Sequence, residues 1–442
     1  PFLNGGLFEC LDRGQKYYDG FSREPAKQAK VPNRLFFDTN DGLLPLLKQY
    51  NFTVEENSPG DEEVALDPEL LGKVFENLLA AYNPETNVQA RKATGSFYTP
   101  REIVSYMVDE SLIAHLITTC GDEHEDTIRT LFNDGERPTD ENLCKSLSNA
   151  LKGIQVLDPA CGSGAFPMGM LRRMVDVLRV LECIPDEDGE RIYNLKLELI
   201  ENAIYGADIQ CIAVQISKLR FFISLVCEQE KTDDPGANYG IHTLPNLETK
   251  FVAADSLIGL PESSDKLPVA EIERLKVELW NVRHEHFIAR SYRQKKKLRQ
   301  KDKTLRHKLA KALQESGGFD TESAELMAEW DPYDQNTSAS YLDPEWMFNV
   351  KDGFDVVIGN PPYKILTVNN TDNAYLETLI SSFCSIKKSH SKNLFVPFVE
   401  TGIRRLLNTK GAFSYIVPEG LFTTRSYQEC KNLLYSHGSV QK

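Results

Sequence analysis

Short apolar segments that each end in an acidic residue alternate with helix-like segments, and this alternation constrains the fold more than any other feature. The apolar segments are IQVLD, AIYGAD and KFVAAD, at Ile154–Asp158, Ala203–Asp208 and Lys250–Asp255. Apolar residues recur at helical spacing in Ala165–Leu181, Arg191–Asn202 and Gln210–Val226. Strands that alternate with helices in this way form βαβ units. We therefore predict an α/β fold with a mainly parallel central sheet, in which the three acids lie at the carboxyl edge, where such sheets bind ligands.

A long polar segment interrupts this pattern before it resumes at FDVVIGN, Phe354–Asn360. The interrupting segment has helical character and contains Arg290–Lys311, which holds eleven Lys or Arg residues. A helix-like run at Asn393–Leu407 and a strand at Ala412–Pro418 come next. We predict four segments: a mainly helical N-terminal region at 1–92, with its clearest helix at Asp67–Tyr82, a first α/β half at 93–265, a helical, basic insertion at 266–345, and a second α/β half at 346–442.

Composition narrows the class of protein. A length of 442 residues suggests about two or three domains. The nine cysteines form no CxxC pair, which is typical of reduced thiols in a cytoplasmic protein. No apolar run approaches the roughly 18–20 residues of a membrane span, and no secretory signal pattern is present. The chain begins at Pro1 rather than Met, so we expect it to be an internal fragment of a longer protein.

Charge and histidine placement leave one question open. The formal net charge of −15 lowers the expectation of nucleic-acid binding without excluding it, because local basic patches decide phosphate binding. Two hypotheses for Arg290–Lys311 remain: the segment contacts nucleic-acid phosphates, or it is a solvated helical arm, as charge runs usually are. His284 and His286 lack further metal-ligand partners, so we predict that both are surface residues and that there is no metal site.

The segment VLDPACGSGAF, Val156–Phe166, has the pattern of a strand, a Gly-rich turn and a helix start. Gly162 and Gly164 let the backbone turn tightly and approach a ligand without a Cβ in the way. The helix start offers free N–H groups to polar atoms of that ligand. The third glycine of a dinucleotide site and the Lys-Ser/Thr of a phosphate loop are both missing. The thiol of Cys161 is expected to pack or to line the ligand, not to act as a nucleophile.

Two further acids are candidate ligand contacts. Asp208 ends the second strand, where a carboxylate can accept hydrogen bonds from both hydroxyls of a ribose. Asp255, which Ser256 follows, ends the third strand and could accept a hydrogen bond from an adenine amino group. Each acid alone is more often a strand-end cap, but three in register after DPACGSG favour a nucleoside site.

The tetrapeptide Asn360-Pro361-Pro362-Tyr363 follows the apolar strand FDVVIG. An aromatic amine is a weak nucleophile because its lone pair is delocalised into the ring. The Asn360 side-chain oxygen and the Pro361 carbonyl could accept its N–H hydrogens and free that lone pair, while consecutive prolines stiffen the loop. Tyr363 could stack on the base. An isolated Asn-Pro-Pro is more often a rigid turn, but the strand and the Gly-rich loop before it favour the catalytic interpretation.

These motifs together resemble the gamma group of amino-methylating DNA methyltransferases of restriction–modification systems, type IIG enzymes first and type I modification subunits next. The motifs that carry the resemblance are, in order, TGSFYTPREIV (Thr94–Val104), VLDPACGSGAF, YGADI (Tyr205–Ile209), AADS (Ala253–Ser256), IGNPPY (Ile358–Tyr363) and FSYIVPEGLF (Phe413–Phe422). PFLNGGLFE (Pro1–Glu9) and LGKVFENLL (Leu71–Leu79) resemble the helical segment that precedes the type IIG methyltransferase.

The resemblance implies a Rossmann-like class I fold and methyl transfer from S-adenosylmethionine to the exocyclic amino group of adenine in DNA. The half at 93–265 would bind the cofactor and the half at 346–442 would carry Asn360, Pro361, Pro362 and Tyr363 as catalytic residues. The expected cofactor-binding residues are Phe97, Tyr98, Thr99, Pro100, Asp158, Pro159, Ala160, Cys161, Gly162, Gly164, Phe166, Asp208, Ile209, Asp255 and Ser256.

The resemblance also implies partners and leaves alternatives. We expect double-stranded DNA as substrate, a nuclease and a target-recognition domain in the same or an associated chain, no membrane, and a cytoplasmic location. The second aromatic residue that holds the flipped base in this family is expected beyond Lys442. The same tetrapeptide serves enzymes that methylate protein glutamine or RNA, and cytosine amino groups are a related target. A non-catalytic DNA-binding or cofactor-sensing scaffold is the alternative of another class.

Overall fold

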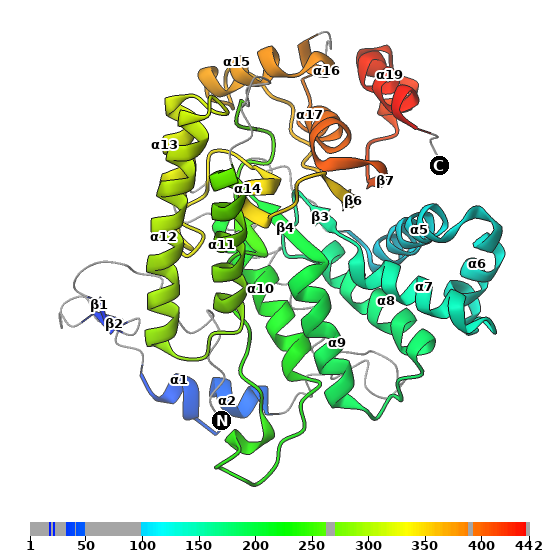
Figure 1. Cartoon of the computed structure of the whole chain (residues 1–442), viewed down its shortest axis with the longest axis vertical. Helices are drawn as coiled ribbons and strands as arrows, with labels where there is room; N and C mark the ends of the chain where they lie inside the picture. Colours follow the sequence, from blue (N-terminus) through cyan, green and yellow to red (C-terminus); the bar gives the residue numbers. More distant parts are fainter. Residues whose placement is uncertain are drawn as a thin grey trace.

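A five-stranded parallel sheet forms the centre of the computed structural model, which describes residues 17–18, 21–22, 32–39, 41–48, 99–261, 270–387 and 392–438. The strand order is β5-β4-β3-β6-β7, and every neighbouring pair is parallel. Figure 1 labels β3, β4, β6 and β7. The strands are β3 (Val156–Asp158), β4 (Ile204–Asp208), β5 (Phe251–Ala253), β6 (Phe354–Gly359) and β7 (Leu407–Tyr415). The predicted α/β fold with a mainly parallel sheet is confirmed, and the order reverses between β3 and β6 as in Rossmann-like sheets.

Alternate residues of the strands enter two different hydrophobic cores. Val156 and Ile204 face one core, whereas Leu157 and Tyr205, the next residues along the same strands, face the other. A strand that is apolar on both faces must be covered on both faces, as is usual for parallel sheets. The molecule therefore has three layers, with helices on either side of the sheet.

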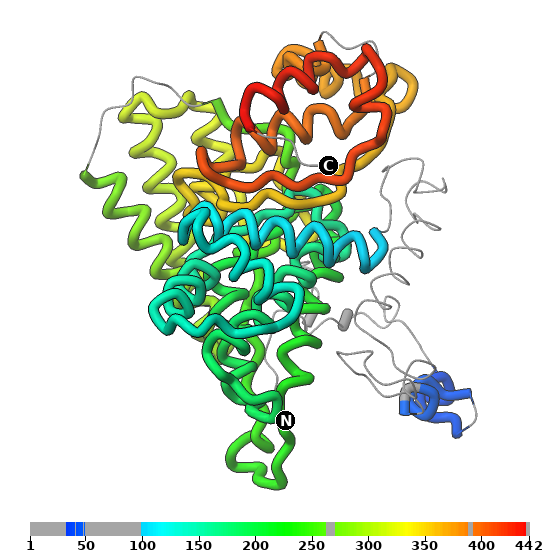
Figure 2. Tube along the Cα trace, turned by 90° about the vertical axis from the view of Figure 1, so that its right-hand side faces the viewer, coloured from blue at the N-terminus to red at the C-terminus, as the bar shows by residue number. Residues whose placement is uncertain are grey.

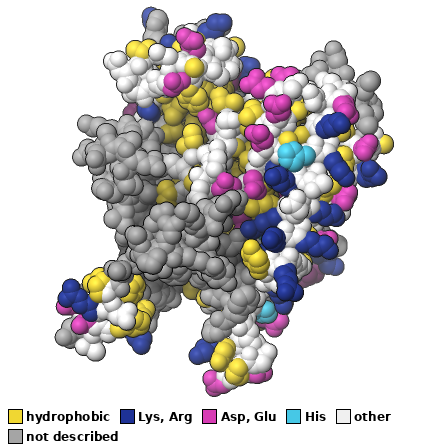
Figure 3. Space-filling view, turned by 90° about the vertical axis from the view of Figure 1, so that its left-hand side faces the viewer, with side chains coloured by type: hydrophobic (Ala, Val, Ile, Leu, Met, Phe, Trp, Pro, Cys, Tyr) yellow, Lys and Arg dark blue, Asp and Glu magenta, His cyan; other side chains and the backbone are white. Residues whose placement is uncertain are grey.

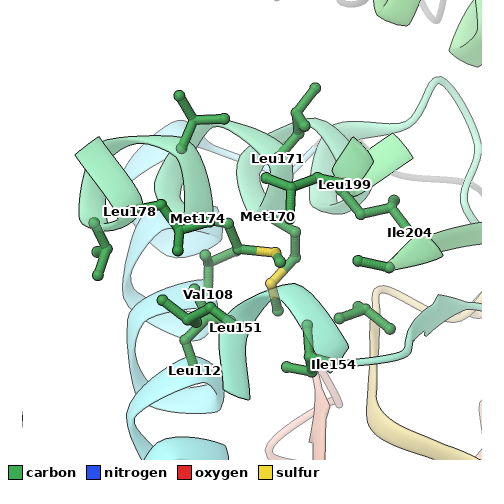
Figure 4. Packing of buried hydrophobic residues seen from close by; sticks show 14 of the residues in the cluster. Val108, Leu112, Leu151, Ile154, Met170, Leu171, Met174, Leu178, Leu199 and Ile204 are labelled. Carbon is green, nitrogen blue, oxygen red and sulfur yellow. The ribbon is translucent and has the colours of Figure 1, made fainter. Parts of the chain in front are cut away.

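The first layer consists of helices that pack on one face of the sheet. They are α5 (Arg101–Cys120), α6 (Glu125–Asp134), α7 (Glu141–Gly153), α8 (Ala165–Glu182), α9 (Gly189–Asn202) and α10 (Cys211–Val226), with short η3 (Asp122–His124) and η4 (Asn238–Gly240). Figure 4 shows the centre of this core, where Met170 and Met174 of α8 lie between residues of α5, α7 and α9. Fully buried side chains of this size contribute about 1.5–3 kcal/mol each, which fixes α8 and the loop before it.

The second layer covers the opposite face and comes from the segment between β5 and β6. Its helices are α11 (Ala270–Phe287), α12 (Tyr292–Glu315), α13 (Thr321–Glu329) and α14 (Pro344–Phe348). The prediction that His284 and His286 are both surface residues is wrong for His286, which is buried and lies 4.6 Å, between ring centroids, from Tyr333. The cause is that α11 is covered by α12 and by the segment that follows α13.

The C-terminal segment forms a third, smaller cluster beside the carboxyl edge of the sheet, drawn orange to red at one end of the molecule in Figure 2. Its elements are α15 (Asn373–Ser382), α16 (Cys384–Lys387), α17 (Phe395–Thr401), the π-helical turn η5 (Gly402–Leu406), α18 (Gly420–Thr423), η6 (Arg425–Tyr427) and α19 (Gln428–His437). The strand predicted at Ala412–Pro418 runs instead from Leu407 to Tyr415, because Leu407 also pairs with Phe354 of β6, across a register irregularity between Phe354 and Val356.

The N-terminal region is described only in part. Its elements are β1 (Tyr17–Tyr18), which pairs with β2 (Phe21–Ser22), and the short helices α1 (Arg34–Phe37) and α2 (Leu43–Leu47). The helix predicted at Asp67–Tyr82 lies outside the described residues.

Candidate active site

The turn after β3 depends on two glycines. Gly162 and Gly164 have φ values of 52° and 83°, in the left-handed region that side chains avoid. A Cβ on Gly164 would also lie 2.8 Å from the Ser217 hydroxyl oxygen. That hydroxyl donates to the Gly162 carbonyl at 2.9 Å, and Arg220 donates to the Ser163 carbonyl at 3.0 Å. The turn is therefore held from outside by α10.

Asp208, at the end of β4, holds the same turn. One carboxylate oxygen accepts a hydrogen bond from the Gly162 backbone N–H at 2.9 Å, and the other accepts from the Gln210 N–H at 2.8 Å. Each carboxylate oxygen can accept a second hydrogen bond, so this contact leaves acceptor capacity for a ribose. Asp208 thus joins the first and second strand ends.

The end of β5 is tied to the turn as well. The Ser256 hydroxyl donates to the Pro159 carbonyl at 2.6 Å. The neighbouring Asp255 carboxylate accepts from the Leu257 N–H at 3.0 Å and from the hydroxyl of Tyr375, on α15. Burial raises the pKa of Asp255 above its usual range. The three strand ends therefore form one connected site.

Asp158 is the most buried acid of this edge, with 1% of its surface exposed. Its side chain accepts the Ala160 backbone N–H at 3.0 Å. Burial raises its pKa well above the usual range, and the negative charge of Asp208 raises it further. A cationic group beside such a carboxyl stabilises its ionised form.

The Asn-Pro-Pro-Tyr loop begins directly beside Asp158, because β3 and β6 are neighbours in the sheet. A Cβ on Gly359, the last residue of β6, would lie 2.7 Å from the Asp158 Oδ1 atom. The turn after β3 and the tetrapeptide after β6 therefore emerge side by side at the point where the strand order reverses. This is the crevice in which open α/β sheets bind their ligands.

The Asn360 carboxamide is held at both ends. Its Nδ2 donates to the Thr99 hydroxyl oxygen at 3.0 Å, across 261 residues of sequence. Its Oδ1 accepts from the Tyr363 hydroxyl at 2.5 Å, and that hydroxyl also lies 2.8 Å from the Ile416 carbonyl oxygen. Thr99, which directly precedes Pro100 and α5, is therefore in contact with the tetrapeptide itself.

The remaining predicted residues differ in their surroundings. Phe166 is buried in the core around α8, and Ile209 is 58% exposed beside the turn. Burial raises the pKa of the Cys161 thiol well above its usual range, which keeps it protonated and a poor nucleophile. The tetrapeptide's Pro361 is buried and Pro362 is half-buried. Phe97 and Tyr98 lie outside the described residues.

Four residues of the site were not predicted. Ser217 and Arg220 fix the turn, Tyr375 contacts Asp255, and Arg405 donates to the backbone carbonyls of Ser256 and Leu257. A signal existed for the first two, because a serine and an arginine three residues apart interrupt the apolar run of α10. No pattern in the sequence around Tyr375 or Arg405 points to the site.

A cavity of about 720 Å³ lies elsewhere, between the sheet and the helices α11 to α14. It is lined by Asn202, Lys250 and Gly353, which precede β4, β5 and β6, and it contains none of the predicted site residues. Because parallel sheets bind ligands at the opposite edge, this cavity is not the candidate active site.

Within the described ranges no group of His, Cys, Asp and Glu is arranged to hold a metal ion. Nor does any described helix combine the length and apolar character needed to cross a membrane.

Comparison with known proteins gives one family and two relatives. The family described as Eco57I restriction-modification methylase matches residues 202–442, more than half of the chain. A Methanocaldococcus jannaschii protein named "Putative type II restriction enzyme and methyltransferase" is 25% identical over 518 aligned positions, which cover 100% of this chain and 40% of that protein. An Escherichia coli protein named as the adenine-specific methyltransferase BrxX is 27% identical over 37% of this chain and 13% of its own length. The chain thus spans less than half the length of these relatives.

Two solved structures are similar at low identity. The DrdV–DNA complex covers 86% of this chain with 15% identity and a TM-score of 0.39. A nuclease-deletion mutant of the type ISP restriction-modification enzyme LlaGI, bound to a DNA substrate mimic, covers 80% with 15% identity and a TM-score of 0.37.

Proposed function

We propose that this chain, which belongs to the Eco57I restriction-modification methylase family, transfers a methyl group from S-adenosylmethionine to the exocyclic amino group of adenine in DNA. The observation that carries the proposal is the pairing of β3 with β6, which sets Asp158 and its Gly-rich turn beside Asn360. A methyl donor and an amine acceptor must meet within a few ångströms, and adjacent strand ends provide that proximity.

The residues present fit S-adenosylmethionine. Gly162 and Gly164 have positive φ values that a side chain would strain, and a Cβ on Gly164 would also collide with Ser217, so only glycines allow this tight turn. Asp158 and Asp255 are buried acids with raised pKa, suited to cationic or N–H groups, and Asp208 keeps acceptor capacity for ribose hydroxyls. When bound, the cofactor would supply a methyl group on a positively charged sulfur. In the proposal these three acids hold its polar groups and Thr99 and Pro100 border its methionine end.

Asn360 and Pro361 act on the target amine. The Asn360 Oδ1 atom and the Pro361 carbonyl oxygen accept hydrogen bonds from its two N–H groups, so that the nitrogen lone pair is less delocalised into the aromatic ring. The Oδ1 atom has two lone pairs, one of which accepts from the Tyr363 hydroxyl, so it can serve both donors. Pro362 stiffens the loop, and the Tyr363 ring offers a stacking surface beside Phe395, with which its centroid distance is 6.2 Å.

The names of two relatives support the choice of adenine as the target and of a nuclease as a partner. The name of the Escherichia coli relative specifies adenine, and the name of the Methanocaldococcus jannaschii relative joins a restriction enzyme to a methyltransferase. We therefore propose adenine as the target, duplex DNA as the substrate, and a nuclease and a target-recognition domain in the same or an associated chain, as in type IIG enzymes. With DNA as the proposed substrate, we also propose a cytoplasmic location.

Methyl transfer from radiolabelled S-adenosylmethionine tests the proposal. The full-length protein is expected to label duplex DNA, and nucleoside analysis is expected to give N6-methyladenine. Label that appears in protein or RNA and never in DNA would overturn the proposal, and N4-methylcytosine would overturn the choice of adenine.

Two substitutions separate catalysis from cofactor binding. Asn360→Ala is expected to abolish transfer while calorimetry gives near-normal cofactor affinity, because only the amine acceptor is removed. Gly162→Val is expected to weaken cofactor binding itself. A loss of cofactor affinity in Asn360→Ala, or unchanged affinity in Gly162→Val, would contradict the roles given to these residues.

A further inference from the structure

Helix α12 separates its charged residues into two sets that face in opposite directions. Asp302, which is 0% exposed, accepts from Arg283 at 3.0 Å and from Arg306 at 2.6 Å, and lies 3.3 Å from the Tyr333 hydroxyl. Arg299 lies with its guanidinium 5.0 Å from the centroid of the Tyr333 ring. These buried contacts join α12 to α11 and to the segment after α13. Part of the basic stretch is therefore structural and holds the helix in place.

The other set faces solvent and makes no ion pair with another described residue. On α12 the exposed cations that make no ion pair with a described residue are Arg293, Lys296, Lys297, Lys303 and Lys308, and Arg290 just before the helix is a further one. Between Tyr292 and Glu315 the one acid is Asp302, which points inward. We call this set the outer face of α12. Figure 3 shows Lys and Arg side chains gathered in a band on this side of the molecule.

The outer face is suited to one kind of partner. Its 24-residue helix is about 36 Å long, close to the roughly 34 Å of one turn of duplex DNA. The chain as a whole carries a formal charge of −15, whereas this face carries a row of cations without ion pairs. The face therefore favours a polyanionic partner. A membrane surface would need an exposed apolar stripe, and the residues between Arg293 and Lys311 on this face are polar or charged.

The direction of α12 also fits a long substrate. The end of α11 lies at the amino edge of the sheet, where the Phe287 carbonyl accepts from the Asn246 N–H ahead of β5. Since α12 runs back from there, its later turns approach the carboxyl edge that carries the candidate active site (Figure 1). A duplex lying along α12 would thus extend toward that edge.

We propose that the outer face of α12 binds backbone phosphates of duplex DNA that flanks the base in the active site. The proposal rests on the proposed function, because it takes the same DNA as partner. It assigns a sequence-independent role, since phosphate contacts position a duplex without reading its bases. Because Asp302 anchors α12, little ordering of the helix itself is required on binding.

Salt-dependent binding tests this surface. The variant combines Arg293→Gln, Lys297→Gln, Lys303→Gln and Lys308→Gln in the full chain. The probe is a fluorescent duplex of about 30 base pairs, and the dissociation constant is measured between about 50 and 200 mM salt. If all four cations contact phosphates, the slope of log affinity against log salt falls by about 3–4, and affinity at low salt falls by about tenfold or more.

A matched variant removes the same charge elsewhere. Lys145→Gln, Lys231→Gln, Lys351→Gln and Lys410→Gln change four exposed lysines outside α12, and the wild-type slope is expected. Exchanging Arg and Lys at the four α12 positions keeps the charge and is expected to keep the slope, which controls for folding. A wild-type slope in the α12 variant, or equal losses in both variants, overturns the proposal.

The remaining outcomes distinguish a failure of this inference from a failure of the proposed function. If the α12 variant binds DNA as the wild type does and still methylates it, only the role of the outer face fails. If the wild type neither binds nor methylates DNA, the proposed function fails with it. If the variant loses binding to phosphatidylserine vesicles and keeps DNA binding, the surface serves a membrane and the inference is wrong.

Discussion

Asp158 and Gly359 meet at the ends of two neighbouring strands, so closely that a Cβ on residue 359 would lie 2.7 Å from the Asp158 Oδ1 atom. The contact joins the last residue of β3 to the residue immediately before Asn360. One glycine therefore sets the distance between the proposed cofactor turn and the proposed amine acceptor. Any side chain there would displace a buried carboxyl or the start of the tetrapeptide.

Gly359→Ala is expected to impair both functions at once. The added methyl group overpacks a buried site, which costs about 1–3 kcal/mol of folding free energy. Cofactor affinity is expected to fall by about tenfold or more, since Asp158 must move. Thermal melting and calorimetry measure the two effects. Gly153→Ala is the control, because nothing lies within 4 Å of a Cβ there, and normal cofactor binding by Gly359→Ala would show that the contact does not matter.

Thr99 is expected to position Asn360 rather than to bind cofactor alone. Its hydroxyl accepts the Asn360 Nδ2 hydrogen at 3.0 Å and so fixes which end of the carboxamide faces the base. Thr99→Val removes the acceptor at nearly constant shape and is expected to lower kcat by about tenfold, with little change in cofactor affinity. Thr99→Ser restores the hydroxyl and is expected to recover kcat. Equal kcat in Val and Ser variants would leave Thr99 with a packing role.

Asp158 makes the affinity for a cationic cofactor depend on pH. Burial raises its pKa, so over a range of pH the free protein holds this carboxyl protonated. A bound cation favours the ionised form, so binding releases a proton and affinity rises with pH until the free carboxyl is already ionised. Calorimetry in buffers of different ionisation enthalpy counts that proton. Asp158→Asn is expected to bind more weakly and without this pH dependence; an unchanged pH profile would place the titration elsewhere.

The sheet and the turn could be predicted from sequence because their signals are local. The apolar runs that end in an acid predicted the bounds of β3, β4 and β5 to within a few residues. The glycines at 162 and 164, which were predicted to form a tight turn, adopt positive φ. The hydrogen-bond partners could not be predicted, since Ser217 donates to the Gly162 carbonyl and Asn360 donates to the Thr99 hydroxyl, and each bond joins residues far apart in the chain.

Errors arose where tertiary contacts override local pattern. His286 sits in a polar helix, yet α12 covers it. Arg306 belongs to a basic run, yet it is buried against Asp302. The start of β7 was missed because Asn408 to Gly411 has the composition of a turn, while the Asn408 side chain donates to Asp355 of β6 at 2.7 Å.

Lys250 is expected to destabilise the fold at neutral pH. It lines the cavity between the sheet and α11, with its ammonium 5.0 Å from the centroid of the Tyr205 ring, and burial lowers its pKa from 10.5 to about 8. Below pH 8 it is charged in both the folded and the unfolded chain, and the folded chain bears the full cost of the buried charge. Between pH 8 and 10.5 the unfolded chain alone stays charged, so that cost fades.

Lys250→Met is therefore expected to raise the free energy of unfolding at pH 7 by about 1–3 kcal/mol. The gain should shrink as pH rises above about 8 and vanish near 10.5, the value at which the unfolded side chain also loses its proton. Urea unfolding at several pH values measures the difference, with the exposed Lys145→Met as control. A gain that stays constant to pH 10.5 would mean that apolar packing of Met, not the removal of a buried charge, stabilises the variant.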